Sequence, residues 1–227
     1  MTCVAGRKLM KSKKITPYYT LYLVTDRELS LGRPTVEIVA SAIKGGVSCV
    51  QLREKKLGTR DFIMEARALQ KLLLPAGIPL IINDRVDVAL ACNAAGVHLG
   101  QSDMKIADAR LLLGENRIIG ISAESPDDAV EAEQQGADYI GISPVFATAT
   151  KTDTATPLGI AGVKEIRRLV SLPLVAIGGI NRENCPDVIR ASADGIAVVS
   201  AIVSAPSPEQ AASLLLKEVN KARGASL

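Results

Sequence analysis

Two aspartates, Asp84 and Asp103, stand at or just beyond the ends of successive apolar runs, 79–84 and 96–101. Two carboxylates that meet, without thiolates or a set of histidines, suit a hard cation such as Mg²⁺, which usually takes one or two carboxylates together with substrate phosphates. Aspartate is also common as a helix cap, and spacing alone does not separate the two roles. Because cationic residues accompany them, we interpret Asp84 and Asp103 as a Mg²⁺ site.

Positive charge for such a site comes from Arg53, Lys55 and Lys151, in two separate segments of the chain. Any one of them alone would be interpreted as an ordinary surface residue. Three cations that converge on a metal site instead indicate a polyanion such as pyrophosphate, which they would stabilise as it departs. We therefore expect these three residues to be catalytic.

A glycine pair, Gly178-Gly179, ends another apolar run. Glycine lets backbone N–H groups approach a ligand closely, and the start of a helix favours an anion. A glycine pair is often only a tight turn, but Ser200 ends the next apolar run along the chain. Together these residues predict a phosphate site.

Residues 143–159, SPVFATATKTDTATPLG, carry a threonine at every second position from 148 to 156, with Lys151 near the middle. Such alternation is typical of a half-buried strand. The segment also contains Asp153, Pro157 and Gly159, and it follows an apolar run that is already long enough to be a strand. We interpret it as a loop whose hydroxyls and Lys151 contact a ligand, and which closes over substrate to exclude water.

These residues need a scaffold that gathers the ends of separate apolar runs. Eight such runs alternate with helical patterns, at 20–26, 47–54, 79–84, 96–101, 118–123, 138–144, 173–179 and 195–201. Several are apolar at consecutive positions, as parallel strands covered on both faces are. We predict a single-domain (β/α)8 TIM barrel over residues 17–227, with its active site at the carboxyl ends of the strands. A doubly wound open sheet is the alternative.

Start signals mark several of the intervening helices. Ser125 and Ser207 each precede a proline and an acidic residue, which predicts an N-cap followed by proline at the first helical position. Thr59 is the predicted cap of a helix with its apolar face over 62–73.

Composition restricts the classes of function. Aromatic residues make up 3% of the 227 residues and tryptophan is absent, which argues against nucleic-acid binding by base stacking. Five lysines and arginines precede the first acid, Asp26, so we expect residues 1–16 to be a disordered basic tail. Because no run of about 18 apolar residues occurs, we expect a soluble cytoplasmic protein with neither membrane nor nucleic-acid partners.

The thiols and the histidine suggest no further chemistry. Cys3, Cys49, Cys92 and Cys185 lack metal-ligand spacing, so we expect reduced and mostly buried thiols. His98 is the only histidine, which excludes polyhistidine metal sites and leaves any Ser-His-Asp chemistry to this residue alone. It lies within an apolar run, and we interpret it as a hydrogen-bonded core residue.

Seven fragments of the chain form a recognisable set: LYLVTDRE, VQLREK, IINDRVDVALACNAAGVHLGQSD, IGISA, GADYIGISPVFATATK, VAIGGI and GIAVVSAI. In this order, from about residue 20 to residue 205, they resemble the thiamine-phosphate synthase family. The resemblance implies a transferase of thiamine biosynthesis that couples 4-amino-2-methyl-5-hydroxymethylpyrimidine diphosphate to a thiazole phosphate, giving thiamine phosphate and pyrophosphate. It also implies a dissociative reaction, in which pyrophosphate leaves, a pyrimidine-stabilised cation forms, and the thiazole nitrogen captures it.

The same resemblance, carried over motif by motif, implies a set of site residues. The pyrimidine diphosphate would contact Gln51, Arg53, Lys55, Asn83, Ser122 and Lys151. Mg²⁺ would be bound by Asp84 and Asp103. The thiazole phosphate would contact Thr148, Thr150, Gly179, Val199 and Ser200. One departure from the family pattern is Ser143, which stands where many relatives have glycine.

Two alternatives stand beside the synthase. An isomerase resembling thiazole tautomerase would need a proton-transfer residue and no metal pair. A non-catalytic relative that binds a phosphate ligand would have damaged metal or cation positions. Asp84, Asp103 and the TATK fragment are intact, which favours the synthase. Its partners would be two small-molecule substrates and, where it forms a homo-oligomer, further copies of the chain.

Overall fold

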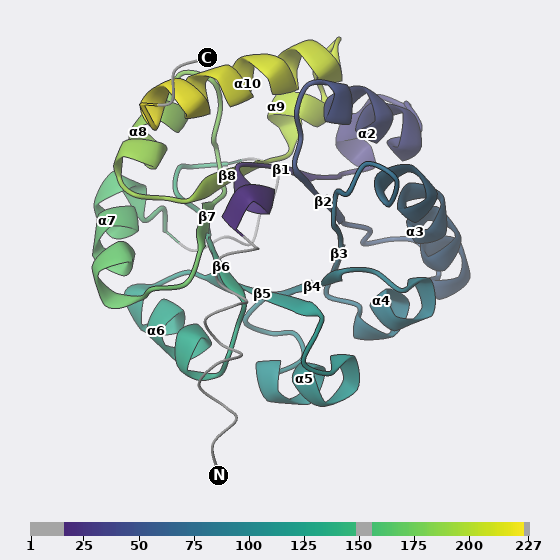
Figure 1. Ribbon diagram of the computed structural model, residues 1–227, viewed down its shortest axis with the longest axis horizontal. Coiled ribbons are helices and arrows are strands. Elements are labelled where there is room, and N and C mark those ends of the chain that lie inside the picture. The colour runs from purple at the N-terminus through teal and green to yellow at the C-terminus, as the bar shows by residue number, and fades with distance from the viewer. Residues whose placement is uncertain (1–15, 149–155, 225–227) are drawn as a thin grey trace.

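The computed structural model describes residues 16–148 and 156–224 of the chain (Figure 1). The predicted disordered tail, 1–16, lies outside the described residues except for Thr16, so it stays a prediction. The short 3-10 helix η1 (Thr16–Tyr19) opens the described part.

Eight parallel strands form one closed barrel in which each strand pairs with its neighbours in chain order. They are β1 (Leu21–Val24), β2 (Cys49–Leu52), β3 (Leu80–Asn83), β4 (Gly96–Leu99), β5 (Ile118–Ala123), β6 (Tyr139–Ile142), β7 (Leu174–Ala176) and β8 (Gly195–Val198). Each lies within one predicted apolar run, so the predicted (β/α)8 barrel is confirmed and the open sheet is wrong. Most strands are shorter than their runs, and Gly178, Gly179, Val199 and Ser200 lie past the strand ends.

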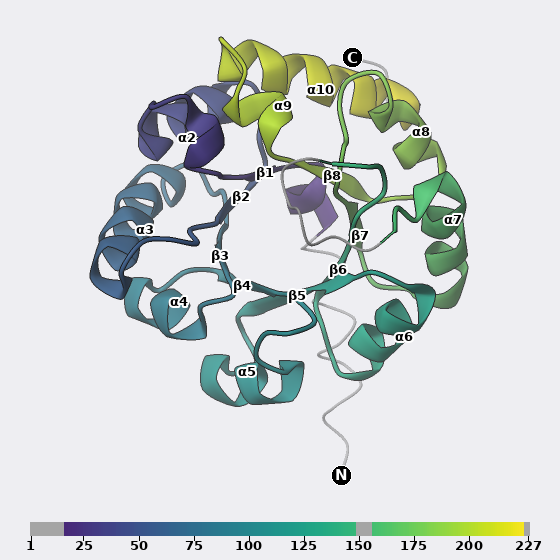
Figure 2. The same ribbon diagram turned by 180° about the vertical axis from the view of Figure 1, so that it is seen from behind.

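The helices form a ring around the barrel (Figures 1 and 2). They are α2 (Thr35–Lys44), α3 (Thr59–Leu73), α4 (Val86–Cys92), α5 (Ile106–Leu113), α6 (Pro126–Gln134), α7 (Gly159–Leu169), α8 (Cys185–Arg190), α9 (Ser200–Val203) and α10 (Pro208–Ala222), with a 3-10 turn, η2 (Glu28–Ser30), after β1. Ser125 and Ser207 cap α6 and α10 as predicted, accepting hydrogen bonds from the N–H groups of Asp128 and Gln210. The predicted Thr59 cap is wrong, because Gly58 is the N-cap of α3 and the Thr59 hydroxyl accepts a hydrogen bond from Arg85.

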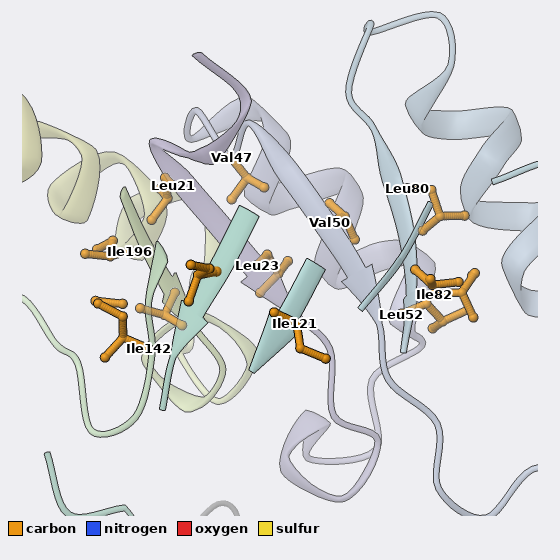
Figure 3. Close-up of a cluster of buried hydrophobic side chains, with 14 of the residues drawn as sticks. Leu21, Leu23, Val47, Val50, Leu52, Leu80, Ile82, Ile121, Ile142 and Ile196 are labelled. Carbon is orange, nitrogen blue, oxygen red and sulfur yellow. The ribbon is translucent and has the colours of Figure 1, made fainter. Parts of the chain in front are cut away.

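Two hydrophobic cores result from the alternation of side chains along each strand. One set points outward to the helices, for example Leu21 and Leu23 of β1 and Val50 and Leu52 of β2 (Figure 3). The alternate set fills the barrel and is more aromatic: Tyr19, Tyr22, Val24, Cys49, Ile81, Tyr139, Val175 and Ala197. Inward positions of the strands are therefore divided between this inner core and the polar residues described below.

The inner core is closed at the end of the barrel where the strands begin. Helix η1 lies there, within the ring of strands (Figure 1), and its Tyr19 is fully buried against Tyr139, with ring centroids 4.6 Å apart. Gly195 makes room for this turn, since a Cβ at that position would lie 1.6 Å from the Tyr19 carbonyl oxygen. A ligand therefore has to enter from the opposite end.

The described cysteines, Cys49, Cys92 and Cys185, are free and buried, as predicted, while Cys3 lies outside the described residues. Within 16–148 and 156–224, none of the helices has the length and apolar character that crossing a bilayer requires.

Candidate active site

A cavity of about 670 Å³ is lined by residues of all eight strands and of the loops that follow β2 to β8. Eleven predicted site residues line it: Gln51, Arg53, Lys55, Asn83, Asp84, Asp103, Ser122, Thr148, Gly179, Val199 and Ser200. The other two, Thr150 and Lys151, lie outside the described residues, as does most of the predicted 148–159 loop. Residues that are far apart in the sequence are thus brought to one end of the barrel.

The two aspartates are neighbours at the cavity mouth. Asp84 follows β3 with a φ of 60°, a conformation uncommon outside glycine, and its N–H donates to the His98 carbonyl oxygen of β4 at 2.9 Å. Asp103 Oδ2 accepts a 2.7 Å hydrogen bond from the Gly100 N–H. Burial first, and then a hydrogen bond with Asp84, raise the pKa of Asp103 above its ordinary value. Neither aspartate is a helix cap, because the N-caps of α4 and α5 are Arg85 and Lys105.

This pair fits the requirements of Mg²⁺. Two carboxylates in contact repel each other when both are ionised, and a divalent cation removes that repulsion. Within the described ranges no cluster of three or more His, Cys, Asp or Glu side chains could hold a metal ion. A site of two carboxylate oxygens leaves room for substrate phosphates, as Mg²⁺ sites usually do.

The two described cations lie differently beside this pair. Lys55 Nζ donates to Asp84 Oδ2 at 2.6 Å, and about half of the lysine side chain (54%) is exposed at the rim. Arg53 is less exposed and is held by Asp26, with 2.8 Å between the Arg53 guanidinium and Asp26 Oδ2. Lys55 can therefore turn to a ligand by releasing an aspartate, whereas Arg53 stays fixed by a partner that the sequence did not indicate.

The opposite side of the mouth is built from backbone. Gly178 and Gly179 have φ values of 101° and 62°, and a Cβ on Gly179 would lie 2.5 Å from the Ala147 carbonyl oxygen. The Gly179 carbonyl accepts a 2.9 Å hydrogen bond from Asn184 Nδ2. Only glycine fits this conformation and this close approach.

Ser200 begins the short helix α9, and Arg33 binds the C-terminal end of this helix. The Arg33 guanidinium donates to the Val203 and Ala205 carbonyls at 2.6 and 2.9 Å. The first bond satisfies a carbonyl in the last turn of α9 that has no partner within the helix, and the second satisfies a carbonyl just beyond its C-cap, Ser204. The position of Ser200 at the cavity is thereby tied to the β1–α2 connection.

Polar groups inside the barrel form the floor of the cavity. A chain of hydrogen bonds joins Gln51, Tyr22, Tyr139, His98 and Ser122. Both ring nitrogens of His98 are bonded, as predicted, but the ring also lines the cavity, which the sequence did not indicate. Burial lowers the pKa of His98 to about 4 and raises the pKa of both tyrosines well above the ordinary range. This floor is therefore uncharged at neutral pH.

Asn83 also belongs to the floor and has an unused donor. The residue is 8% exposed, and its Nδ2 is buried without a hydrogen-bond partner. An unpaired buried donor costs stability unless a ligand or water satisfies it. Asn83 therefore has one donor left for a ligand or a water molecule.

Tyr22 and Tyr139 are among the lining residues that the sequence analysis missed. Both lie in apolar runs, LYLV and YIGI, where tyrosine is indistinguishable from an ordinary core residue. The available signal was the strand period of two, which places Tyr22 and Val24 on one face and Leu21 and Leu23 on the other.

Known proteins with the same features identify the family. The model of the thiamine monophosphate synthase family matches residues 21–202. A thiamine-phosphate synthase of Albidiferax ferrireducens is 55% identical over 188 residues, 83% of this chain and 86% of that protein. One from Clostridium novyi is 54% identical over 185 residues, 82% of this chain and 91% of that protein.

A solved structure agrees over nearly the whole fold. The thiamine phosphate pyrophosphorylase from Pyrococcus furiosus superposes with a TM-score of 0.86 at 39% identity, covering 92% of this chain and 99% of that one. Similarity of sequence and of fold thus coincide over the barrel, and the chain belongs to the thiamine monophosphate synthase family.

Proposed function

We propose that the chain is a thiamine-phosphate synthase, which couples 4-amino-2-methyl-5-hydroxymethylpyrimidine diphosphate to a thiazole phosphate and releases pyrophosphate. One observation carries the proposal. A single cavity holds a carboxylate pair with Arg53 and Lys55 at one side and a glycine-built anion pocket beside Ser200 at the other. Two phosphate-bearing substrates can therefore meet in it.

The charged side of the cavity would receive the diphosphate. Arg53 and Lys55 would bind its oxygens, and their charge stabilises negative charge as it accumulates on departing pyrophosphate. Lys151 is proposed for the same role, although it lies outside the described residues. Release of the Asp84–Lys55 ion pair would make the lysine available when the ligand enters.

Mg²⁺ is the proposed cofactor, with Asp84 and Asp103 as its ligands. When bound, it would neutralise charge on the diphosphate and so favour departure of the leaving group. The raised pKa of Asp103 supports this role, because the ionised pair gains more from a cation than isolated aspartates do.

The neutral floor would hold the pyrimidine. Gln51, Asn83 and Ser122 offer amide and hydroxyl groups there, and the unpaired Nδ2 of Asn83 would donate to the pyrimidine diphosphate. Loss of pyrophosphate leaves a cation on the pyrimidine side, which the thiazole nitrogen captures without any base on the protein. The uncharged surroundings and the low pKa of His98 agree with a step that needs no protein base.

The anion pocket would receive the thiazole phosphate. Gly179, Val199 and Ser200 line it, together with Thr148, and Thr150 is proposed to join them. Backbone N–H groups approach a phosphate closely where glycine leaves no side chain in the way. The thiazole ring nitrogen would then face the pyrimidine across the same cavity.

The test is direct. The purified chain is incubated with both substrates and Mg²⁺, and thiamine phosphate and pyrophosphate are quantified together. We expect both products in equal amounts, and neither when one substrate is withheld. Isomerisation of a thiazole carboxylate phosphate in the absence of the pyrimidine would favour the tautomerase alternative. Tight binding of thiamine phosphate without turnover would favour the non-catalytic one.

A further inference from the structure

Five side chains on five strands form one continuous chain of hydrogen bonds across the barrel floor. Gln51 Nε2 lies 3.1 Å from the Tyr22 hydroxyl, which lies 3.0 Å from the Tyr139 hydroxyl. The Tyr139 hydroxyl lies 2.8 Å from His98 Nδ1, and His98 Nε2 lies 3.0 Å from Ser122 Oγ. Its two ends, Gln51 and Ser122, are both predicted ligands of the pyrimidine diphosphate.

Each phenol and the neutral imidazole has a single proton to donate. Once the group at one end of the chain donates, every further link must therefore donate in the same direction. An amide nitrogen only donates, which makes the Tyr22 oxygen an acceptor and sends the Tyr22 proton on to Tyr139. Tyr139 then donates to Nδ1 of the neutral His98 ring. The ring proton is therefore on Nε2 and is donated to Ser122 Oγ, whose own proton is left to point away from the ring.

The opposite arrangement of the two phenols is less favourable. If Tyr139 donated to Tyr22, the Tyr22 oxygen would receive two donors and its own proton would need another acceptor. Tyr22 is 1% exposed, and the group beside it is the Cys49 thiol, a weak acceptor. The direction from Gln51 to Ser122 gives the donor of every link a strong acceptor.

The interior is shaped to hold this chain. A Cβ at Gly120 would lie 2.1 Å from the Tyr139 ring, and one at Gly141 would lie 3.0 Å from the His98 ring. Both glycines occupy inward strand positions, where a side chain would displace the phenol or the imidazole. The space that they leave is filled by the two central members of the chain.

We propose that Tyr22 and Tyr139 are positioning residues. The Gln51 amide sets the direction of hydrogen-bond donation, and the two tyrosines pass this direction through His98 to Ser122. The Ser122 hydroxyl is thereby set as a donor to an acceptor atom of the ligand in the cavity. The identity of that ligand, the pyrimidine diphosphate, rests on the proposed function; the direction of the chain does not.

The position of one proton tests the direction. Because His98 is the only histidine of the chain, ¹⁵N NMR of the substrate-free, ¹⁵N-histidine-labelled protein reports its tautomer without ambiguity. We expect the Nε2–H tautomer in the unaltered chain. An Nδ1–H tautomer would overturn the proposal without the need for any variant.

Gln51→Glu tests the transmission. At mildly alkaline pH the ionised carboxylate introduced at this position only accepts, so Tyr22 donates to it, Tyr139 donates to Tyr22, and His98 donates from Nδ1. The histidine is expected to change to the Nδ1–H tautomer, although two phenols separate it from the substitution. A protonated carboxyl would donate to Tyr22 as the amide does, so the ionised state is verified by ¹³C NMR of the introduced carboxyl. Retention of Nε2–H in a folded variant with that carboxyl ionised would contradict the proposal.

The matched control interrupts the series of hydrogen bonds between position 51 and His98. In Tyr22→Phe/Gln51→Glu, Tyr139 can still donate to His98, so the Nε2–H tautomer is expected to persist. A change to Nδ1–H in this double variant would mean that charge at position 51 acts through space, which would also contradict transmission. All spectra are independent of turnover, so inactivity of the unaltered chain would remove the proposed function and leave this result standing.

Kinetics provide the second readout. Tyr139→Phe is expected to raise KM for the pyrimidine diphosphate about tenfold and to leave KM for the thiazole phosphate unchanged, because only the Ser122 side of the cavity loses its fixed donor. Equal increases in both values would indicate a merely structural role for the tyrosine.

Discussion

The two sides of the cavity mouth differ in how they handle negative charge. The side formed by β2 to β5 has charged side chains: Arg53, Lys55, Asp84, Asp103 and Glu124. The side formed by β6 to β8 has no charged side chain among its described lining residues, and instead offers glycine backbone, Thr148, Asn181 and Ser200. One closed barrel thus supports two kinds of anion site.

The two sides also differ in the contacts that their own residues make. On the charged side Asp84 disfavours the ionisation of Asp103, and Lys55 is engaged by Asp84, so a ligand and the proposed metal would relieve an unfavourable arrangement of charge. On the backbone side Gly179 is held by Asn184, so a phosphate bound there as proposed would meet fixed groups. We therefore expect substitutions on the charged side to affect mainly turnover, and those on the backbone side to affect mainly binding.

Asp103→Asn should have the largest effect. It keeps an oxygen to accept the Gly100 N–H bond but removes a charge from the proposed Mg²⁺ ligands. Loss of metal stabilisation, worth several kcal/mol, corresponds to a fall in kcat of about 1000-fold. Steady-state assays across Mg²⁺ concentrations measure it, and unchanged turnover would remove the metal assignment.

Metal removal and pH test the assignment of Asp103 as a Mg²⁺ ligand through the stability of the protein. Without metal, the raised pKa of Asp103 means that its contribution to stability is present at low pH and is lost as the pH rises through that raised value. Mg²⁺ should therefore raise Tm at neutral pH in the unaltered chain, because it binds only the folded state. Asp103→Asn should show no such increase; an equal Mg²⁺ effect in both proteins would place the ion elsewhere.

Lys55→Met should come next. Removal of one cation that stabilises the departing pyrophosphate is expected to lower the single-turnover rate by about 100-fold. Lys56→Met is the matched control, because the adjacent Lys56 pairs with Glu28 at the surface, where its side chain is 82% exposed. If both variants lost the same rate, general charge rather than the position of Lys55 would explain the effect.

The fold could be predicted from the sequence because it depends on repeated, local patterns. Each apolar run contains one strand, and the Ser-Pro signals start helices α6 and α10. The strand-end rule of barrels then places Asp84 and Asp103 at one mouth without further information. Thr59 failed as a cap because Gly58 can take the N-cap conformation, and propensity does not decide between adjacent positions.

The cavity floor could not be predicted in the same way. Tyr139 and His98 meet only because Gly120 on β5 and Gly141 on β6 leave room for the phenol and the imidazole, respectively. Likewise Asp26 holds Arg53 from a different loop. These contacts depend on register between strands that are far apart in sequence, for which local patterns contain no signal.

Gly179→Ala should have the smallest effect on activity and the most selective one. A Cβ there would lie 2.5 Å from the Ala147 carbonyl oxygen, and the alanine would have to adopt a φ of 62°. The anion pocket must therefore shift. We expect KM for the thiazole phosphate to rise about tenfold, equivalent to about 1.4 kcal/mol, with KM for the pyrimidine diphosphate unchanged. Steady-state kinetics with each substrate varied in turn measures both values.

Gly77→Ala separates the cost of a positive φ from the cost of the close contact that a Cβ would make at Gly179. Gly77 has a φ of 66° but nothing within 4 Å of a Cβ, so its substitution carries the conformational cost alone, about 1–2 kcal/mol of unfolding free energy. Both alanine variants should lose that stability, and only Gly179→Ala should also lose affinity for the thiazole phosphate. A change of KM in Gly77→Ala would mean that KM responds to backbone strain in general. A rise in KM for both substrates in Gly179→Ala would mean that the two sides of the mouth do not act separately.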